Sequence, residues 1–382
     1  MDFTLTEEQQ MLRQSVRQFA ESEIAPHCRR FDEGVEFPHE IFRKMGQMGY
    51  LGITIPETYD GAGMSFHDYA IIIEEIARID PAIALGVAAH NGLCTSHVYR
   101  FGSEDLKRKY LKPLARGEYL GAWSLTEPTA GSDAGGTRSR AVRDGDGWVL
   151  NGAKTFATHG SVGRLCVVFC VTDPEKGKKG ISAFLLEKGM AGFRHGKVED
   201  KMGMRASDTA EVVMEECRVP HANLLGKEGM GFVNALEILD RGRIAIAALS
   251  LGTAQGAYEV ARNYARERKQ FGRPIAANQA IAFMLADMAM KIEASRLLTY
   301  RAACTVDAGK ERVTRCAAMA KLFASETAVW VAEHGVQILG GYGYVKDFPA
   351  EKFYRDAKLC TIGEGTSEIQ RLVIARSLME SV

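Results

Sequence analysis

The stretch Asp144-Gly145-Asp146-Gly147, near the middle of the chain, is a turn signal typical of a β-hairpin. The segments 137–143 and 148–158 flank it and are predicted to be its two strands. Further strand-like segments follow at 165–171, 181–186 and 210–214. Because no helical pattern separates these strands, residues 120–231 are predicted to form a small antiparallel β-barrel or sandwich, and we adopt the barrel.

Helical patterns lie on the N-terminal side of this region, in residues 1–119. Thr6 with Gln9, and Ser65 with Asp68, have the spacing of capping boxes, in which a side chain accepts a hydrogen bond from the helix start. Asp80-Pro81 begins a segment that is apolar on every face through Ala89. A helix of that kind must be buried.

Longer helical patterns lie on the C-terminal side, in residues 232–382. Helices are predicted at about 233–269, 277–308, 312–338 and 350–358, followed by a C-terminal helix. Four long helices in succession favour an antiparallel bundle. The predicted fold is therefore multidomain α and β: an N-terminal helical domain, a middle antiparallel β-barrel domain and a C-terminal four-helix bundle.

The composition excludes several classes of function. Lys plus Arg and Asp plus Glu number 48 each, so the formal net charge is zero, which argues against nucleic acid or an anionic membrane as the main partner. No apolar run reaches the roughly 18 residues of a membrane span, and the acidic start of the chain does not resemble a targeting peptide. Eight cysteines without a Cys-x-x-Cys pair indicate reduced thiols, a cytoplasm-like compartment and no metal site.

A candidate catalytic residue lies near the C-terminus, in the stretch 361–370. Glu364 stands there between Gly363 and Gly365, and Thr366 can cap the helix that follows. Free N–H groups of the first helical turn lie close to such a carboxylate. A base beside N–H donors suits removal of a proton next to a carbonyl group. The alternative is an ordinary loop with an acidic residue near a helix start.

Three other motifs have a binding interpretation and a plainer one. Residues 123–133 form a strand and a Gly-, Ser- and Thr-containing loop that can present N–H and hydroxyl groups to a ligand, or form a simple turn. Phe156 and Thr158 share one strand face, which suits a flat heterocycle, although a core Phe is commoner. The cations of 266–275 beside Phe271 suit a pyrophosphate and an aromatic base, or simply a solvated helix end.

Taken together, these segments resemble the acyl-CoA dehydrogenase family over the whole chain. Four strings appear in the family's order and spacing: Leu125-Thr126-Glu127-Pro128-x-Ala130-Gly131-Ser132-Asp133, Arg268-Lys269-x-Phe271-Gly272, Gln337-Ile338-Leu339-Gly340-Gly341 and Glu364-Gly365-Thr366. The family fold consists of an N-terminal helical domain, a middle β-domain and a C-terminal four-helix bundle. The resemblance therefore implies the architecture predicted above.

The resemblance also implies an activity and a cofactor, FAD. Glu364 matches the family's catalytic base, which takes the α-proton of an acyl thioester while the β-hydrogen leaves as hydride to flavin N5. The backbone N–H of Glu364 and a ribityl hydroxyl of FAD would polarise the thioester carbonyl, and Thr158 would bond near N5. Burial is expected to raise the pKa of the Glu364 carboxyl.

Further site residues follow from the resemblance position by position. The FAD positions are Trp123, Leu125, Thr126, Ser132, Phe156, Thr158, Arg268, Phe271, Gln279, Thr366 and Glu368, with Gln337 and Gly341 reaching FAD from a neighbouring subunit. The positions lining the coenzyme A and acyl channel are Ser132, Asp240, Arg243 and Gly365.

Several positions bear on which acyl group the chain accepts. Some branches of the family carry the base where Gly242 stands, so this chain resembles the short-, medium- and short-branched-chain branches, with Glu364 acting alone. Gly363 and Phe156 stand where many members have tyrosine and tryptophan, which removes bulk near the flavin. Residues 81–99, expected to floor the acyl pocket, contain no Lys or Arg, so an uncharged acyl group is expected.

The space left by Gly363 has two interpretations. It can favour a branched, cyclic or aryl-substituted acyl group over a bare four-carbon chain. Alternatively, a neighbouring aromatic residue fills it, with Tyr342 and Tyr344 as candidates, and the specificity is ordinary.

The resemblance implies acyl-CoA as substrate, an electron-transferring flavoprotein as electron acceptor and a homotetramer, although some members are dimers. It points to fatty-acid β-oxidation or amino-acid catabolism, in a bacterial or archaeal cytoplasm or, for a processed chain, the mitochondrial matrix. Neither nucleic acid nor membrane insertion is expected. The alternatives are an acyl-CoA oxidase or flavin monooxygenase on the same fold, and a DNA-binding member with little activity.

Overall fold

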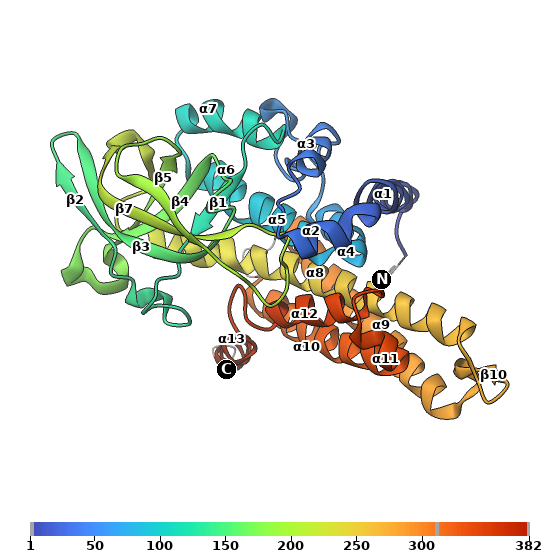
Figure 1. Ribbon diagram of the computed structural model, residues 1–382. Coiled ribbons are helices and arrows are strands. Elements are labelled where there is room, and N and C mark those ends of the chain that lie inside the picture. Colours follow the sequence, from blue (N-terminus) through green and yellow to red (C-terminus); the bar gives the residue numbers. More distant parts are fainter. Residues whose placement is uncertain (1–3, 310–312, 380–382) are drawn as a thin grey trace.

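The computed structural model describes residues 4–309 and 313–379, and it confirms the predicted fold class. A helical N-terminal part, a β-sheet part and a long C-terminal helical bundle lie side by side (Figure 1). The N-terminal helices are α1 (Glu7–Phe19), α2 (Cys28–Gly34), α3 (His39–Gln47), α4 (Phe66–Ile79), α5 (Pro81–Ala89), α6 (Ser96–Phe101) and α7 (Glu104–Ala115).

The predicted caps of these helices are confirmed. The Thr6 side chain accepts a hydrogen bond from the Gln9 N–H at 3.2 Å, and the Ser65 hydroxyl accepts one from the Asp68 N–H at 3.0 Å. Asp80 caps α5, in which every residue is buried. A π-helical turn, His90–Thr95, continues α5 directly. Such turns are rare in proteins overall, but those that occur are often at functional sites. The sequence pattern does not reveal this one.

The middle domain is one eight-stranded sheet. Its strands are β1 (Gly121–Ser124), β2 (Arg140–Asp144), β3 (Gly147–Thr158), β4 (Leu165–Val171), β5 (Ile181–Glu187), β6 (Phe193–Val198), β7 (Thr209–Pro220) and β8 (Leu224–Leu225). The predicted hairpin joins β2 to β3 and pairs Asp144 with Gly147.

Two features of this sheet correct the predicted antiparallel barrel. First, β1 and β2 both pair with β4 in parallel. The β2–β3 hairpin connects β1 to β4, and β3 connects β2 to β4, so the chain has the length that a crossover between parallel strands requires. Second, the pairing order β6-β7-β3-β2-β4-β5-β8 has β6 and β8 at its ends. Hydrogen bonds between the described strands therefore do not close a continuous barrel.

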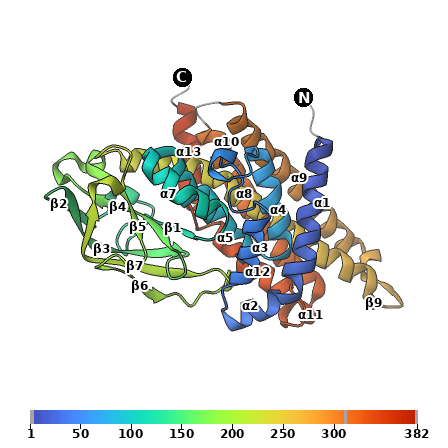
Figure 2. The same cartoon turned by 90° about the horizontal axis from the view of Figure 1, so that it is seen from above.

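The C-terminal domain is built on α8 (Gly231–Glu267), which runs along the whole bundle (Figures 1 and 2). With 37 residues, α8 is about 56 Å long. A short hairpin follows at its far end, and the remaining elements are β9 (Lys269–Gln270), β10 (Arg273–Pro274), α9 (Gln279–Asp307), α10 (Thr314–Leu339), α11 (Gly341–Tyr344), α12 (Ala350–Cys360) and α13 (Ser367–Met379). Residue 312, where one helix is predicted to begin, lies outside the described residues.

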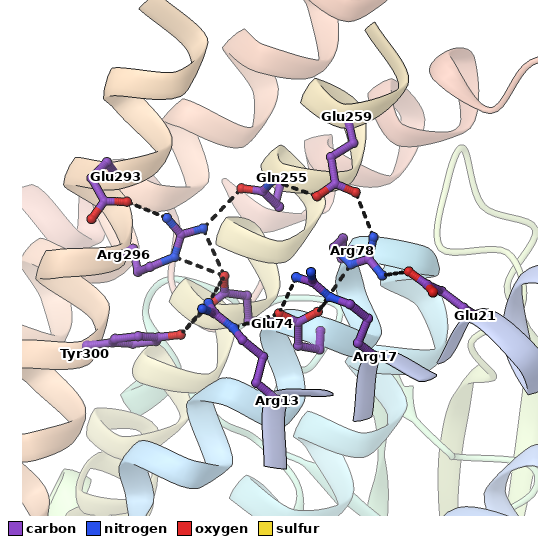
Figure 3. Close-up of polar contacts among 11 residues, drawn as sticks. Arg13, Arg17, Glu21, Glu74, Arg78, Gln255, Glu259, Glu293, Arg296 and Tyr300 are labelled. Atoms are coloured by element: carbon purple, nitrogen blue, oxygen red, sulfur yellow. Dashed lines mark hydrogen bonds and ion pairs between the residues drawn. The ribbon is translucent and has the colours of Figure 1, made fainter. Parts of the chain in front are cut away.

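A buried ion-pair network joins the N-terminal helices to the bundle (Figure 3). The carboxylates of Glu74 and Glu75, on α4, are almost completely buried. Arg13 of α1 and Arg296 of α9 both contact Glu74, and the Tyr300 hydroxyl donates to it at 2.6 Å. The remaining members extend the network on either side: Arg17, Glu21, Arg78, Gln255, Glu259 and Glu293. The network thereby ties α1 and the bundle helices α8 and α9 to α4.

Candidate active site

The loop between α12 and α13 holds Glu364 in an uncommon backbone conformation. Glu364 has φ +52° and Gly365 has φ +93°, both in the left-handed region that disfavours a side chain. The Thr366 hydroxyl accepts a hydrogen bond from the Ile369 N–H at 3.3 Å, so Thr366 caps α13 as predicted. Among the described residues no hydrogen bond is formed by the Glu364 N–H. The loop thus presents a carboxylate and a backbone donor together.

The Glu364 carboxylate points at α8. Its Oε2 atom is buried and has no hydrogen-bond partner in the described part of the chain. A methyl group added at Gly242 would overlap this oxygen and would lie 3.3 Å from Leu93 Cδ2. Glycine at 242 therefore leaves the space that the carboxylate uses, and no second acid can stand there beside it.

Burial dominates the electrostatics of this carboxyl group. It raises the pKa of Glu364 to about 7, while the cations Lys321 and Arg243 act in the opposite direction. A base needs a pKa near the working pH, so that it is ionised and still holds a proton firmly once taken. The confirmed expectation of a raised pKa makes Glu364 suited to that task.

An apolar cluster lies next to Glu364 and Gly242. Leu93 belongs to it, and its other members are Ala89, Ile238, Phe101, Trp123 and Leu239. The Trp123 indole N–H donates to His97 Nδ1 at 3.3 Å, which joins β1 to α6. An acyl chain whose α-carbon lies at Glu364 would find apolar walls here, from the helical domain, the sheet and α8.

Asp240 and Arg243 form an ion pair on α8, and the two residues flank Gly242 in the sequence. Arg243 is buried and donates to Asp240, which also accepts from the Thr314 hydroxyl. Burial raises the pKa of Asp240, against the lowering effect of Arg243. The Arg243 Nε is buried without a partner among the described residues. A buried donor of this kind can bind a polar ligand.

Several of the predicted flavin residues gather where β1 meets β3. The Thr155 N–H donates to the Thr126 carbonyl at 2.8 Å, and Leu125 is buried beside it. The side chains of Ser124 and Thr155 are buried with unpartnered hydroxyl groups in the described part of the chain. Phe156, at φ +58°, is 64% exposed.

These features fit FAD. An exposed aromatic ring can stack on a flat heterocycle, and hydroxyl groups that lack a partner can form hydrogen bonds to one. Thr158 is partly exposed two residues further along β3, and Ser132 is exposed in the loop after β1. Glu368 lies, exposed, in the first turn of α13.

A buried ion pair holds this part of the sheet together. The Lys154 ammonium, on β3, contacts the Glu127 carboxylate at 2.7 Å, and neither side chain reaches solvent appreciably. Glu127 also accepts from Thr137 and Ser139 and from the Arg138 N–H. Burial alone would raise the pKa of Glu127, but Lys154 and the hydroxyl donors lower it to about 2. The loop after β1 is thereby tied to β3.

The other predicted FAD residues lie far from Glu364. Arg268, Phe271 and Gln279 lie at or directly after the C-terminal end of α8, Gln337 and Gly341 lie where α10 ends and α11 begins, and all five are exposed. About 25 residues of α8, roughly 38 Å, separate Gly242 from this end. A groove there of about 460 Å³ is lined in part by Arg268, Gly341 and Tyr342. The structure therefore divides the predicted cofactor residues into two groups.

Sequence reasoning missed two single residues and one ion pair of the site. Tyr69, on α4, is completely buried near Glu364. Burial raises the pKa of Tyr69 most, and the Glu364 carboxylate raises it further. Lys321 and the Glu127–Lys154 pair were also missed. For Lys321 a signal exists, because it is a lone cation in the apolar stretch 317–324. The other two depend on contacts between distant segments.

A helical domain, a sheet and a bundle around a buried carboxylate, beside a surface suited to a flavin, define the class of flavin-dependent dehydrogenases. Comparison with known proteins identifies the family. Residues 6–118, 122–217 and 229–379 match the models of the N-terminal, middle and C-terminal domains of acyl-CoA dehydrogenase.

Individual relatives cover almost the whole chain. A short-chain specific acyl-CoA dehydrogenase of Clostridium acetobutylicum is 50% identical over 98% of this chain and 99% of its own. The butyryl-CoA dehydrogenase structure from Megasphaera elsdenii has a TM-score of 0.97, with 42% identity over 99% of this chain and 100% of that one.

A third relative comes from a structural study of the electron-transferring flavoprotein of Acidaminococcus fermentans and flavin-based electron bifurcation. That chain has a TM-score of 0.98, with 48% identity over 99% of this chain and 100% of its own. The present chain belongs to the acyl-CoA dehydrogenase family, and its activity is the FAD-dependent dehydrogenation of acyl-CoA thioesters.

Proposed function

We propose that Glu364 is the base that removes the α-proton of the acyl thioester, and that the Glu364 N–H donates to the thioester carbonyl. When bound, FAD supplies the acceptor for the hydride that leaves the β-carbon, and the product is the trans-2-enoyl thioester. The observation that carries this proposal is the buried Glu364 Oε2, which has no hydrogen-bond partner among residues 4–309 and 313–379 and lies against Gly242, next to Leu93 of the apolar cluster. The free N–H would stabilise the negative charge that develops on the carbonyl oxygen.

The remaining residues of the protomer bind and orient. We propose that Trp123, Leu125, Thr126, Ser132, Phe156, Thr158, Thr366 and Glu368 hold the flavin part of FAD. Ser132, Asp240, Arg243 and Gly365 line the path of coenzyme A and the acyl group. The unpartnered Nε of Arg243 supports an anionic or carbonyl partner at that point.

The acyl group is proposed to be uncharged, of short to medium length, with room for branches or rings. In the segment 81–99 burial lowers the pKa of both His90 and His97 to about 3, so neither carries a charge that could pair with a dicarboxylic substrate. The three atoms nearest to a Cβ at Gly363 would all belong to Leu359, at 3.6 Å or more. Tyr342 packs against Tyr264 and Phe348, and Tyr344 is exposed, so neither aromatic residue fills that space.

The chain's partners are proposed from the same relatives. An electron-transferring flavoprotein would reoxidise the flavin, and the exposed far end of the bundle would join copies into a homotetramer. Fatty-acid β-oxidation and amino-acid catabolism are the corresponding pathways. All eight cysteines are free, which supports a reducing compartment such as a cytoplasm or mitochondrial matrix. No described helix has the length and apolar character needed to cross a membrane.

Glu364→Gln tests the role of the base, because the amide is nearly isosteric but cannot take a proton. We expect FAD content and thermal unfolding temperature to match wild type, and flavin reduction by butyryl-CoA to slow at least about a thousandfold. Anaerobic rapid-reaction absorbance measures that rate. Reduction within about tenfold of wild type would show that another group removes the proton.

A further inference from the structure

A second charged residue lies behind the catalytic loop. Lys321, on α10, has no exposed surface, and its neighbours on the helix at 317, 318, 320 and 324 are buried alanines. A buried ammonium group without partners is costly, so its contacts are informative. Its Nζ donates a hydrogen bond to the Gly365 carbonyl at 2.8 Å. The buried cation of the stretch 317–324 therefore contacts Gly365, the residue that follows Glu364.

The same carbonyl is held from the other side. The Gln370 side-chain amide, on α13, donates to the Gly365 carbonyl at 2.9 Å. A Cβ at Gly365 would lie 2.7 Å from the Gln370 Nε2, so any larger residue would displace this amide. Donors from α10 and α13 therefore meet at one oxygen. They hold a backbone turn whose left-handed conformation at Glu364 is unfavourable by itself.

The charge of Lys321 also interacts with the Glu364 carboxylate. The charged and titratable groups around it are Cys360 of α12, Glu364, Arg243 of α8 and Glu368 of α13. Burial lowers the pKa of Lys321 to about 8, while Cys360, Glu364 and Glu368 act in the opposite direction. Around Glu364 the charged groups are Lys321 and Arg243, with Tyr69 contributed by α4. Burial keeps the pKa of Tyr69 far above neutrality and that of Cys360 at about 11, so both are neutral at pH 7.

We propose that Lys321 is a positioning residue for the base: its ammonium fixes the Gly365 carbonyl and, with it, the orientation of Glu364, and its charge favours the ionised carboxylate. This inference rests on the proposed role of Glu364. A merely structural lysine would stabilise the bundle and leave the ionisation of Glu364 unchanged.

The test compares Lys321→Met and Lys321→Gln with wild type in the FAD-loaded protein. The pH profile of kcat/KM in wild type is expected to rise through the pKa of Glu364, about 7. Loss of an adjacent positive charge raises a carboxyl pKa, so the midpoint should move upward by about one pH unit in both variants. Amide hydrogen exchange in residues 361–366 should become about tenfold faster in Lys321→Met, independently of activity.

Lys352→Met is the matched control. Lys352 is also a buried lysine, paired with Asp356 at 2.7 Å and Asp80 at 3.3 Å, but it is not among the charges that act on Glu364. Its loss should lower the unfolding temperature and leave the midpoint in place. An unchanged midpoint in both Lys321 variants, or a midpoint that moves equally in Lys352→Met, would overturn the inference. Flavin reduction in Glu364→Gln within about tenfold of the wild-type rate would instead overturn the role of Glu364 itself.

Discussion

At the scale of single residues, the site depends on where a side chain is absent as much as on where one is present. Gly242 leaves room for the Glu364 carboxylate, and Gly365 allows Gln370 to reach the loop carbonyl. Sequence reasoning identified Glu364 from a local motif and Gly242 from the family resemblance. It could not show that the two face each other, because they are more than 120 positions apart and meet only when α8 packs against the loop.

Gly242→Ala tests this close approach. The added methyl group would overlap the Glu364 Oε2, and the carboxylate would have to move. A displacement of about 1 Å at a reacting group costs roughly a hundredfold in rate, so kcat/KM for butyryl-CoA should fall by about that factor. The measurement is steady-state kinetics on protein with full FAD content.

Gly335→Ala is the control for Gly242→Ala. Gly335 also lies inside a long helix, α10, but a Cβ there meets only the Ala257 carbonyl at 3.5 Å. Alanine should leave kcat/KM unchanged and stabilise the fold by about 0.4–1 kcal/mol, since it reduces the freedom of the unfolded chain. Wild-type kinetics in Gly242→Ala would mean that the carboxylate does not need its present position.

At the scale of elements, local signals predicted the helices well and the sheet incompletely. Thr6, Ser65 and Asp80 cap their helices, and the Asp-Gly turn joins β2 to β3, because each of these structures involves neighbours in the sequence. The parallel pairing of β1 with β4 involves partners about 44 positions apart. No local pattern encodes that register, since only the packing of the whole domain selects it.

Lys154→Met tests the ion pair that ties the loop after β1 to β3. It would leave the Glu127 carboxylate buried and unpaired, which typically destabilises a protein by about 3–5 kcal/mol. We expect a lower unfolding temperature and a lower ratio of FAD to protein at pH 7. Because the pKa of Glu127 is lowered in the fold, to about 2, the pair's contribution is present above about pH 4.5 and declines as the pH falls toward 2.

Lys176→Met is the matched control, because Lys176 contacts Asp173 at the same 2.7 Å in the same domain but is largely exposed. Exposed pairs contribute about 0–1 kcal/mol, so both the unfolding temperature and the FAD content should stay near wild type. If the two variants behaved alike, burial of the Glu127–Lys154 pair would have no special role.

At the scale of the molecule, one chain does not bring its predicted cofactor residues together. Only Gln337 and Gly341 are assigned to a neighbouring subunit by the resemblance, yet Arg268 lines the same groove as Gly341 at the far end of α8. Phe271 and Gln279 follow Arg268 closely in the chain. Phe271 is 97% exposed and has φ +52°. We therefore propose that all five residues act on the FAD of another copy, which no reading of motif order could reveal.

Coexpression of two inactive variants, Glu364→Gln and Phe271→Asp, tests that division. In a mixed dimer, the chain with an intact Glu364 would receive an intact Phe271 from its partner, so one site of two would be complete. With random assembly about a quarter of all sites, and about a quarter of wild-type activity, should return. Absence of activity in mixed oligomers isolated with two affinity tags would show that each chain serves its own FAD.

The ion-pair network around Glu74 and Glu75 has a consequence for the order in which the chain can fold during synthesis. Arg13 and Arg17 leave the ribosome before the two glutamates, but Arg296 and Tyr300 follow more than 200 residues later. At about 5–20 residues per second, α4 waits at least about 10 s for these partners. During that interval Arg13, Arg17 and Arg78 can pair with Glu75, but Glu74 has only its share of Arg13, and its contacts with Arg296 and Tyr300 form only when α9 arrives.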